Sequence, residues 1–404
     1  MRILHVIPYF PPASAFGGPP KATYLVAREL AKRGHEVTVY TTDAKDLRTR
    51  IWDGKAPWVE REVDGVRAVY FRNLTMLTVK MFKLFVTPAL PARARKEVKG
   101  FDVVHLHEFR TLQNAAAARA AREHGVPYVL QAHGSVPRVG SWKTLKLLYD
   151  AVYGYKLLRG ASRAIALTKA EAGHYKRMGV PEEKITIVPN GIDLSEYSDL
   201  PPKGAFKEKF NVPEDKRIVL YIGRIHWIKG VDILVKAYAL LAKQPGFKDT
   251  ILVVAGPDDG YLGRVKSLVR ELGIPDSALF TGPLYGRDKL SAYVDAEFIV
   301  LPSRYETFPY VVLEAYACAK PVIASNVEAM PDIVLHGETG LLFRAGDERE
   351  LASALAHLLE NPKEAEKMGR NARKLAEEKY SIDKIAAELE KVYEEVIHKN
   401  GKYE

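Results

Sequence analysis

Two cations, Arg224 and Lys229, stand in the segment IGRIHWIKG (222–230), after an apolar run and before a helix-periodic stretch. At the carboxyl end of a strand, side-chain cations and the positive end of a helix dipole converge on one point, where a phosphate binds. Arginine grips two oxygens at once, whereas lysine acts as a point charge. The pair therefore predicts a phosphate site, and two solvated surface charges are the alternative.

Two carboxylates follow in PSRYETFPYVVLEAYA (302–317), with Glu306 before a predicted helix and Glu314 on it, eight residues later. Eight residues are close to two helical turns, so both side chains can face one side, about 10–12 Å apart. That spacing does not suit an acid–base pair, but it fits two ends of an elongated polyol, because carboxylates accept hydrogen bonds from vicinal hydroxyls. Glu314 also lies among apolar residues, where an unpaired carboxylate is costly. We predict that both glutamates bind a sugar-like ligand.

Three weaker signals lie in the first half of the chain. Gly17 and Gly18 precede a helix, where backbone amides can approach an anion closely, and a flexible turn is the alternative. His133 ends the apolar run YVLQAH and is placed to hydrogen-bond a substrate, although a histidine there is more often structural. His105 and His107 share one strand face, but no third metal ligand is apparent, so we expect no metal site.

The elements that position these residues form two successive series of short β-branched runs alternating with helix-periodic stretches. Such runs predict parallel strands that helices cover on both faces. The two series meet near residues 194–210, so we expect an α/β protein of two Rossmann-like, doubly wound parallel-sheet domains facing a central cleft. The expected strands cover residues 3–7, 36–42, 66–71, 102–107, 128–133, 163–168 and 185–190 in the first series, and 217–224, 250–257, 278–284, 297–303 and 320–325 in the second.

Six motifs occur in a characteristic order over nearly the whole chain: GGPPKATYLVARELAKRGHEVTV, the QAHG loop, VPNGID, GRIHWIKG, the E-x7-E pair of YETFPYVVLEAYACAKPVIAS, and GETGLLF. With these motifs the sequence resembles the retaining glycosyltransferases of family 4, the group 1 glycosyl transferases of the GT-B fold. The resemblance implies that residues 205–380 bind a nucleotide-sugar donor, a UDP- or GDP-sugar. It also implies that residues 1–195 bind the acceptor, together with a C-terminal helix in 385–404 that crosses back.

The resemblance further implies a role for each candidate residue. Arg224 and Lys229 match the pair that holds the diphosphate and offsets charge on the leaving group. Glu314 matches the carboxylate that binds the ribose hydroxyls, whereas Glu306 and His133 match residues beside the transferred sugar. Catalytic roles are expected for Arg224, Lys229, Glu306 and His133. Further contacts to the sugar donor are expected from Gly17 and Gly18 at the phosphates, from the amides of Thr307, Phe308 and Pro309, and from the backbone of Pro283 and Leu284 at the base.

The implied reaction is hexosyl transfer with retention of anomeric configuration. The leaving nucleoside diphosphate requires stabilisation of negative charge, which cations and a helix N-terminus supply without metal. The sequence contains no DxD motif, so we expect neither a metal nor another cofactor. Many relatives have glycine where Thr307 stands, and its side chain is expected to narrow or re-aim the sugar pocket.

Sixty Lys and Arg against fifty Asp and Glu give a net charge of +10, which suits an anionic membrane, a phosphorylated substrate or nucleic acid. Two segments, 74–100 and 141–163, mix basic with aliphatic and aromatic residues, as amphipathic helices in a membrane interface do. No apolar run is long enough to span a bilayer, and no signal peptide is recognisable. We therefore expect a cytoplasmic enzyme, peripheral on an anionic membrane surface, whose acceptor is lipid-linked or a growing glycan.

Other functions remain open from sequence. A soluble sugar phosphate or glucan is the alternative acceptor. A nucleotide-sugar epimerase on the same fold is a less favoured alternative. Binding of nucleic acid is also less favoured, because no nucleic-acid-binding motif occurs and the basic residues are scattered through both halves.

Overall fold

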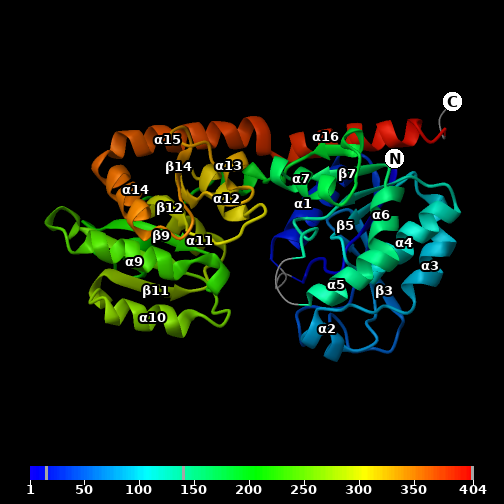
Figure 1. Ribbon diagram of the computed structural model, residues 1–404, viewed down its shortest axis with the longest axis horizontal. Helices are drawn as coiled ribbons and strands as arrows, with labels where there is room; N and C mark the ends of the chain where they lie inside the picture. The colour runs from blue at the N-terminus through cyan, green and yellow to red at the C-terminus, as the bar shows by residue number, and fades with distance from the viewer. Residues whose placement is uncertain (14–16, 139–141, 402–404) are drawn as a thin grey trace. The chain divides into compact units, whose positions relative to one another are not determined.

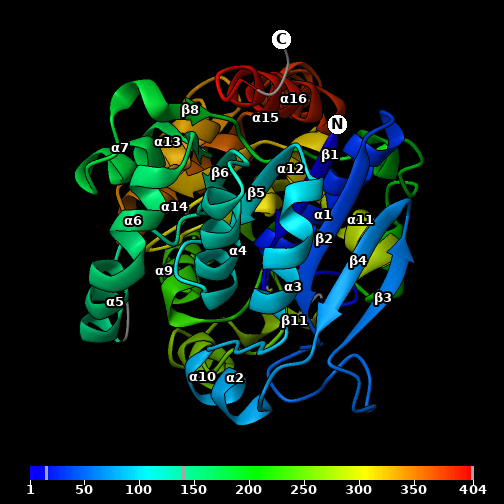
Figure 2. The same ribbon diagram turned by 90° about the vertical axis from the view of Figure 1, so that its right-hand side faces the viewer.

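A computed structural model describes residues 1–13, 17–138 and 142–401 of the chain (Figures 1 and 2). The chain divides into two units: residues 1–191 with 382–404 form unit 1, and residues 192–381 form unit 2. Each unit is built on a largely parallel sheet with α-helical connections. The expected class, two Rossmann-like α/β domains, is thereby confirmed.

The sheet of unit 1 has eight strands in the order β3-β4-β2-β1-β5-β6-β7-β8. Its central strands are buried apolar runs, as a sheet covered on both faces requires. One strand, β3, was not expected and runs antiparallel to β4 at the sheet edge. The strands are β1 (Arg2–Val6), β2 (Glu36–Thr42), β3 (Trp58–Val63), β4 (Val66–Phe71), β5 (Val103–His107), β6 (Tyr128–Gln131), β7 (Arg163–Ala166) and β8 (Ile185–Ile187).

Helices cover both faces of this sheet (Figure 2). Helix α3 packs on α4, and α1 packs on α16, although α1 and α16 lie at opposite ends of the sequence. None of the helices in the described ranges combines the length and apolarity needed to cross a bilayer. The helices of unit 1 are α1 (Gly18–Lys32), α2 (Met76–Phe82), α3 (Leu90–Glu97), α4 (Leu112–Glu123), α5 (Lys143–Tyr149), α6 (Tyr155–Gly160), α7 (Lys169–Arg177) and α16 (Ile382–His398).

Unit 2 has a six-stranded parallel sheet in the order β11-β10-β9-β12-β13-β14. Strand β14 was not expected from the sequence. The strands are β9 (Arg217–Ile222), β10 (Thr250–Ala255), β11 (Ala278–Gly282), β12 (Ala296–Leu301), β13 (Val322–Ser325) and β14 (Gly340–Phe343). The helices are α8 (Ala205–Lys209), α9 (Val231–Ala242), α10 (Leu262–Glu271), α11 (Gly286–Asp295), α12 (Tyr310–Ala317), α13 (Met330–Ile333), α14 (Glu348–Glu360) and α15 (Pro362–Leu375).

This topology decides which loops meet. In a parallel sheet the loops that follow neighbouring strands emerge at one edge. In unit 2, β9 and β12 are neighbours, so the loops leading to α9 and α12 lie side by side. In unit 1, β1, β5 and β6 are consecutive in the sheet, so the residues at their carboxyl ends are brought together in the same way.

Candidate functional site

In unit 2, the β9–α9 loop and the β12–α12 loop pack directly on each other. Gly230 adopts a left-handed conformation (φ 67°), and a Cβ there would lie 1.9 Å from the carbonyl oxygen of Pro302. The backbone N–H of Arg304 donates to the carbonyl of Ile228 at 2.8 Å, and its guanidinium binds both carboxylate oxygens of Asp232 at 2.7 and 2.9 Å. Only glycine permits this approach, which holds the two loops as one rigid surface.

The clamped loops bring two of the candidate residues together. The ammonium of Lys229 donates to Oε1 of Glu306 at 2.5 Å, and the hydroxyl of Ser303 donates to the same oxygen at 2.8 Å. Glu306 is only 6% exposed, and the side chain of Lys229 is 21% exposed. A buried carboxylate persists as an ion only where it is paired and hydrogen-bonded. The pair therefore presents a partly accessible cation whose position is fixed by the protein.

Arg224 has a different environment. It follows β9, its side chain is about half exposed, and its guanidinium pairs with Asp259 at 2.5 Å. An exposed ion pair of this kind contributes little to stability, so an incoming phosphate can displace Asp259 at small cost.

Glu314 lies on α12 and is 6% exposed. Its two carboxylate oxygens accept hydrogen bonds from Lys289 and Tyr293, both at 2.9 Å, and both of these residues belong to α11. The pKa of the Tyr293 hydroxyl lies well above its usual range, mainly because the group is buried and in addition because Glu314 is negatively charged. This hydroxyl therefore stays a hydrogen-bond donor. Sequence reasoning missed Lys289 and Tyr293.

The remaining candidates of unit 2 are backbone positions. Pro283 and Leu284 form the turn between β11 and α11. Thr307 is partly exposed, and Phe308 is buried, with its ring 6.0 Å from that of Tyr380. Pro309 is the N-cap of α12 and has no backbone N–H. The expectation of an amide donor at Pro309 is therefore wrong.

In unit 1, Gly17 is the N-cap of α1 with φ 86° and ψ −140°, a conformation open mainly to glycine. Two prolines follow Gly18, at positions 19 and 20, and neither has an N–H. Gly17 and Gly18 are therefore the residues whose N–H groups can meet an anion at this helix start.

His133 follows β6 in a left-handed conformation (φ 51°), and Gly134 continues it at φ 81°. The carboxylate of Glu171 holds this turn, since it accepts from the N–H of Gly134 at 2.5 Å and from that of Leu167 at 2.8 Å. Burial raises the pKa of Glu171 to about 7, and the two backbone N–H groups act against that rise. The sequence signal for Glu171 was the capping pattern T-x-x-E at 168–171, since the hydroxyl of Thr168 accepts from the N–H of Glu171.

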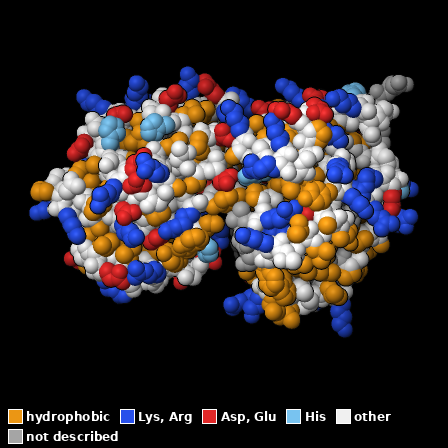
Figure 3. Space-filling model, in the orientation of Figure 1, with side chains coloured by type: hydrophobic (Ala, Val, Ile, Leu, Met, Phe, Trp, Pro, Cys, Tyr) orange, Lys and Arg blue, Asp and Glu red, His pale blue; other side chains and the backbone are white. Residues whose placement is uncertain are grey.

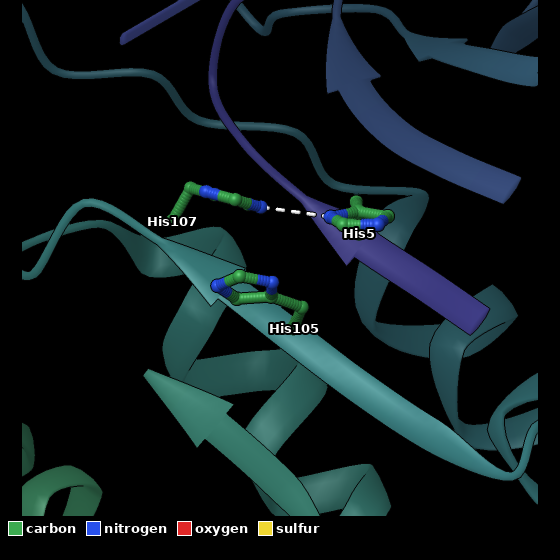
Figure 4. Close-up of side chains that lie close together, drawn as sticks. All are labelled: His5, His105 and His107. Atoms are coloured by element: carbon green, nitrogen blue, oxygen red, sulfur yellow. Dashed lines mark hydrogen bonds between the residues drawn. The ribbon is translucent and has the colours of Figure 1, made fainter. Parts of the chain in front are cut away.

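The histidines of β5 have a third neighbour that the sequence did not reveal. His5, on the adjacent β1, lies beside His105 and His107, and nitrogens of the three rings fall within 4.8 Å of one another (Figure 4). No third ligand was apparent from the sequence, because strand pairing joins residues about a hundred positions apart. The rings of His105 and His107 are stacked, with centroids 4.0 Å apart. Stacked rings direct their lone pairs nearly parallel, whereas ligands of one ion must converge on it. The arrangement therefore favours hydrogen bonding over metal binding.

Comparison with known proteins shows the family to which the chain belongs. Residues 202–375 match the family described as glycosyl transferases group 1, and residues 16–196 match glycosyltransferase family 4. A D-inositol 3-phosphate glycosyltransferase of Thermobispora bispora is 30% identical over 395 residues, which cover 93% of this chain and 89% of that protein. The chain therefore belongs to the group 1 glycosyl transferases, and it is a glycosyltransferase of the GT-B type.

Solved structures show the same fold. Sucrose-phosphate synthase from Thermosynechococcus elongatus superposes with a TM-score of 0.77 at 23% identity, over 98% of this chain and 99% of that one. Anabaena HepE in complex with UDP-glucose superposes with a TM-score of 0.74 at 18% identity, over 98% of this chain and 100% of that one.

Proposed function

We propose that this glycosyltransferase moves a hexosyl group from a UDP- or GDP-sugar to an acceptor hydroxyl, with retention and without a metal ion. The observation that carries the proposal is the Lys229–Glu306 pair, an ammonium held at 2.5 Å by a buried carboxylate within two clamped loops. A cation fixed before the reaction stabilises the departing diphosphate without reorganisation. The UDP-glucose bound by HepE, a protein of the same fold, supports this choice of sugar donor.

The other residues take complementary roles in this proposal. Arg224 releases Asp259 and binds the diphosphate with Lys229. Glu314 accepts hydrogen bonds from the ribose hydroxyls, and hydrogen bonds from Lys289 and Tyr293 orient its carboxylate. In addition, Gly17 and Gly18 offer amides to the phosphates, the backbone of Pro283 and Leu284 contacts the base, the Thr307–Phe308 turn borders the sugar, and His133 contacts the transferred sugar.

The test is a nucleotide panel. We expect UDP or GDP to raise the melting temperature, and EDTA to leave that rise unchanged. The ligand at 100 times its dissociation constant stabilises the folded state by about 2.7 kcal/mol. Glu314→Gln keeps the size of the side chain but removes its charge, so the shift should fall strongly. Glu271→Gln, at an exposed ion pair with Arg264, is the matched control. Equal shifts in both variants would contradict the assigned ribose site.

For the acceptor, we propose a lipid-linked glycan presented at an anionic membrane. Helices α2 and α5 expose a surface of large apolar side chains, and the rings of Phe82 and Trp142 join them at 5.2 Å. Figure 3 shows this apolar surface at the lower end of unit 1. The exposed Lys80 and Lys83 on and beside α2 add positive charge. The surface, called here the α2–α5 surface, consists of Leu74, Leu77, Met81, Phe82, Leu84, Trp142, Leu145, Leu147 and Leu148.

Vesicle flotation tests this surface. We expect the protein to float with vesicles containing anionic lipid and not with neutral ones, because apolar insertion and charge attraction act together. Leu77→Asp with Met81→Asp should abolish flotation. Leu240→Asp, at an exposed apolar residue of unit 2, should not. Equal recovery with neutral and anionic vesicles would exclude the membrane proposal.

A soluble sugar phosphate is the second candidate acceptor, and the similarity to D-inositol 3-phosphate glycosyltransferases favours it. Transfer to inositol phosphate in solution, at a rate that vesicles do not change, would select this candidate.

A further inference from the structure

Three imidazoles of unit 1 form one hydrogen-bonded chain. Nδ1 of His5 lies 2.8 Å from Nε2 of His107, and Nδ1 of His107 lies 2.9 Å from Nε2 of His133. The rings come from β1, from β5 and from the turn after β6, and these three strands are consecutive in the sheet. Figure 4 shows the first link, with His107 and His5 facing each other across the strands. All three side chains are buried.

The hydrogen atoms of such a chain are coupled. Burial lowers the pKa of both His5 and His133 to about 3, and that of His107 well below its usual value, so the rings are neutral at pH 7. A neutral imidazole has one N–H and one bare nitrogen. Each link needs one donor and one acceptor, so all the N–H groups must point the same way along the chain. Two arrangements result: His133 has its proton on Nδ1, or it has its proton on Nε2.

The His5 ring, at the end of the hydrogen-bonded series away from His133, distinguishes the two arrangements. Nε2 of His5 is buried and has no hydrogen-bond partner within residues 1–13, 17–138 and 142–401. If His133 is protonated on Nε2, the His5 atom is an N–H without an acceptor. If His133 is protonated on Nδ1, the His5 atom is a bare nitrogen. Buried orphan N–H groups are rarer in proteins than buried under-satisfied acceptors. The hydrogen-bonded series of imidazoles therefore favours the Nδ1–H form of His133.

We propose that His5 and His107 are positioning residues that fix His133 as its Nδ1–H tautomer, so that His133 donates a hydrogen bond to an oxygen of the transferred sugar. His5 acts through two imidazoles and touches no substrate itself. The inference rests on the proposed function for the identity of the ligand. The tautomer itself does not depend on that function.

Nitrogen NMR of the full-length protein with 15N-labelled histidine tests the tautomer directly, because protonated and bare ring nitrogens have different shifts. We expect wild-type His133 to be protonated on Nδ1. His5→Asp places an acceptor oxygen where His5 has its donor Nδ1–H, so it reverses the direction of the links and should move the proton of His133 to Nε2. His5→Asn, whose amide N–H can replace Nδ1–H, should preserve the wild-type pattern. His105→Phe is the control, because His105 stacks on His107 but bonds to Tyr393 instead.

Turnover provides the second measurement. We expect His5→Asp to lower kcat about tenfold with a nearly unchanged KM for the sugar donor, and His5→Asn to keep the wild-type kcat. Observation of wild-type His133 with its proton on Nε2 overturns the proposal even if His5→Asp does not fold. So does one bound metal ion per chain that is lost in His5→Phe. If no sugar is transferred by the wild type, the proposed function fails, while the tautomer result still stands or falls by itself.

Discussion

At the scale of single residues, Lys229 and Glu306 are mutually dependent. Glu306 accepts from Lys229 and Ser303, and it lies below the surface. Loss of the ammonium leaves the carboxylate buried with only a neutral hydroxyl beside it, which is costly. The same ammonium is the fixed cation of the proposed diphosphate site. Nζ of Lys229 therefore contributes both to the proposed binding of the diphosphate and to the stability of the loop that contains Glu306.

Lys229→Met tests this coupling. We expect kcat/KM to fall about 10²- to 10³-fold, because one preorganised charge is lost where negative charge develops. A smaller loss of thermal stability should accompany it. The control is Lys209→Met, which breaks an exposed pair with Asp288 in the same unit. Steady-state kinetics and thermal unfolding compare the two variants. Wild-type turnover in Lys229→Met would contradict the assignment of Lys229 to the site.

At the scale of elements, β1, β5 and the turn after β6 place four histidines inside one sheet. Burial lowers their pKa values, to about 3 for His5 and His133 and well below the usual value for His105 and His107. In the unfolded chain they take up protons near pH 6.5. Their contribution to the free energy of unfolding is therefore fully present above pH 6.5 and is lost as the pH falls toward 3. Glu171, whose pKa is raised to about 7, acts in the opposite sense between pH 7 and 4.5.

His105→Phe removes one group that takes up a proton in the unfolded chain but not in the folded protein. Between pH 6 and 4 we expect the free energy of unfolding of the wild type to fall more steeply than that of the variant, by about 1.4 kcal/mol per pH unit. Urea denaturation at several pH values measures both slopes. Leu240→Phe, at an exposed residue without an ionisable group, should keep the wild-type slope. Parallel slopes for wild type and His105→Phe would contradict the burial of a neutral ring.

The strands that the sequence did not predict are those that are exposed or short. β2 was expected at residues 36–42 and is found there, because EVTVYTT is a buried β-branched run. β3 was missed because WVEREV lies at an exposed edge and contains three charged residues, so it lacks the apolar signal of a central strand. β14 was missed because GLLF is short and follows a turn sequence.

The candidate residues were recognisable because they follow strands or stand among apolar residues. Their partners were not. Lys229 and Glu306 are 77 positions apart, and His5 and His107 are 102 apart. Strand order decides such pairings, and one sequence does not give it. Lys289 also escaped notice because it resembles any lysine on the surface of a helix.

At the scale of the whole molecule, the last helix belongs to the first unit. α16 buries eight side chains in unit 1, and its Glu390 pairs with Arg33 and His35. Its Tyr393 hydroxyl also lies 2.6 Å from Nδ1 of His105. A large apolar side chain contributes about 1.5–3 kcal/mol when fully buried. Unit 1 therefore depends on a segment that follows unit 2 in the chain.

Deletion of residues 382–404 tests this dependence. We expect unit 1 to unfold or to melt far below its normal temperature, while unit 2 keeps its transition. Calorimetry should show the separate effects, and limited proteolysis should leave a protected fragment within 192–381. Deletion of residues 399–404 alone is the control and should change little. Equal loss of both transitions would contradict the assignment of α16 to unit 1 alone.

The placement of α16 also orders events during synthesis. A ribosome releases β1 first, yet the surface of α1 that α16 covers stays open until residue 398 has left the exit tunnel. All of residues 192–381 emerge before that moment, so unit 2 has its full set of strands while unit 1 still lacks a helix. The N-terminal unit is the first to begin folding and the last to finish.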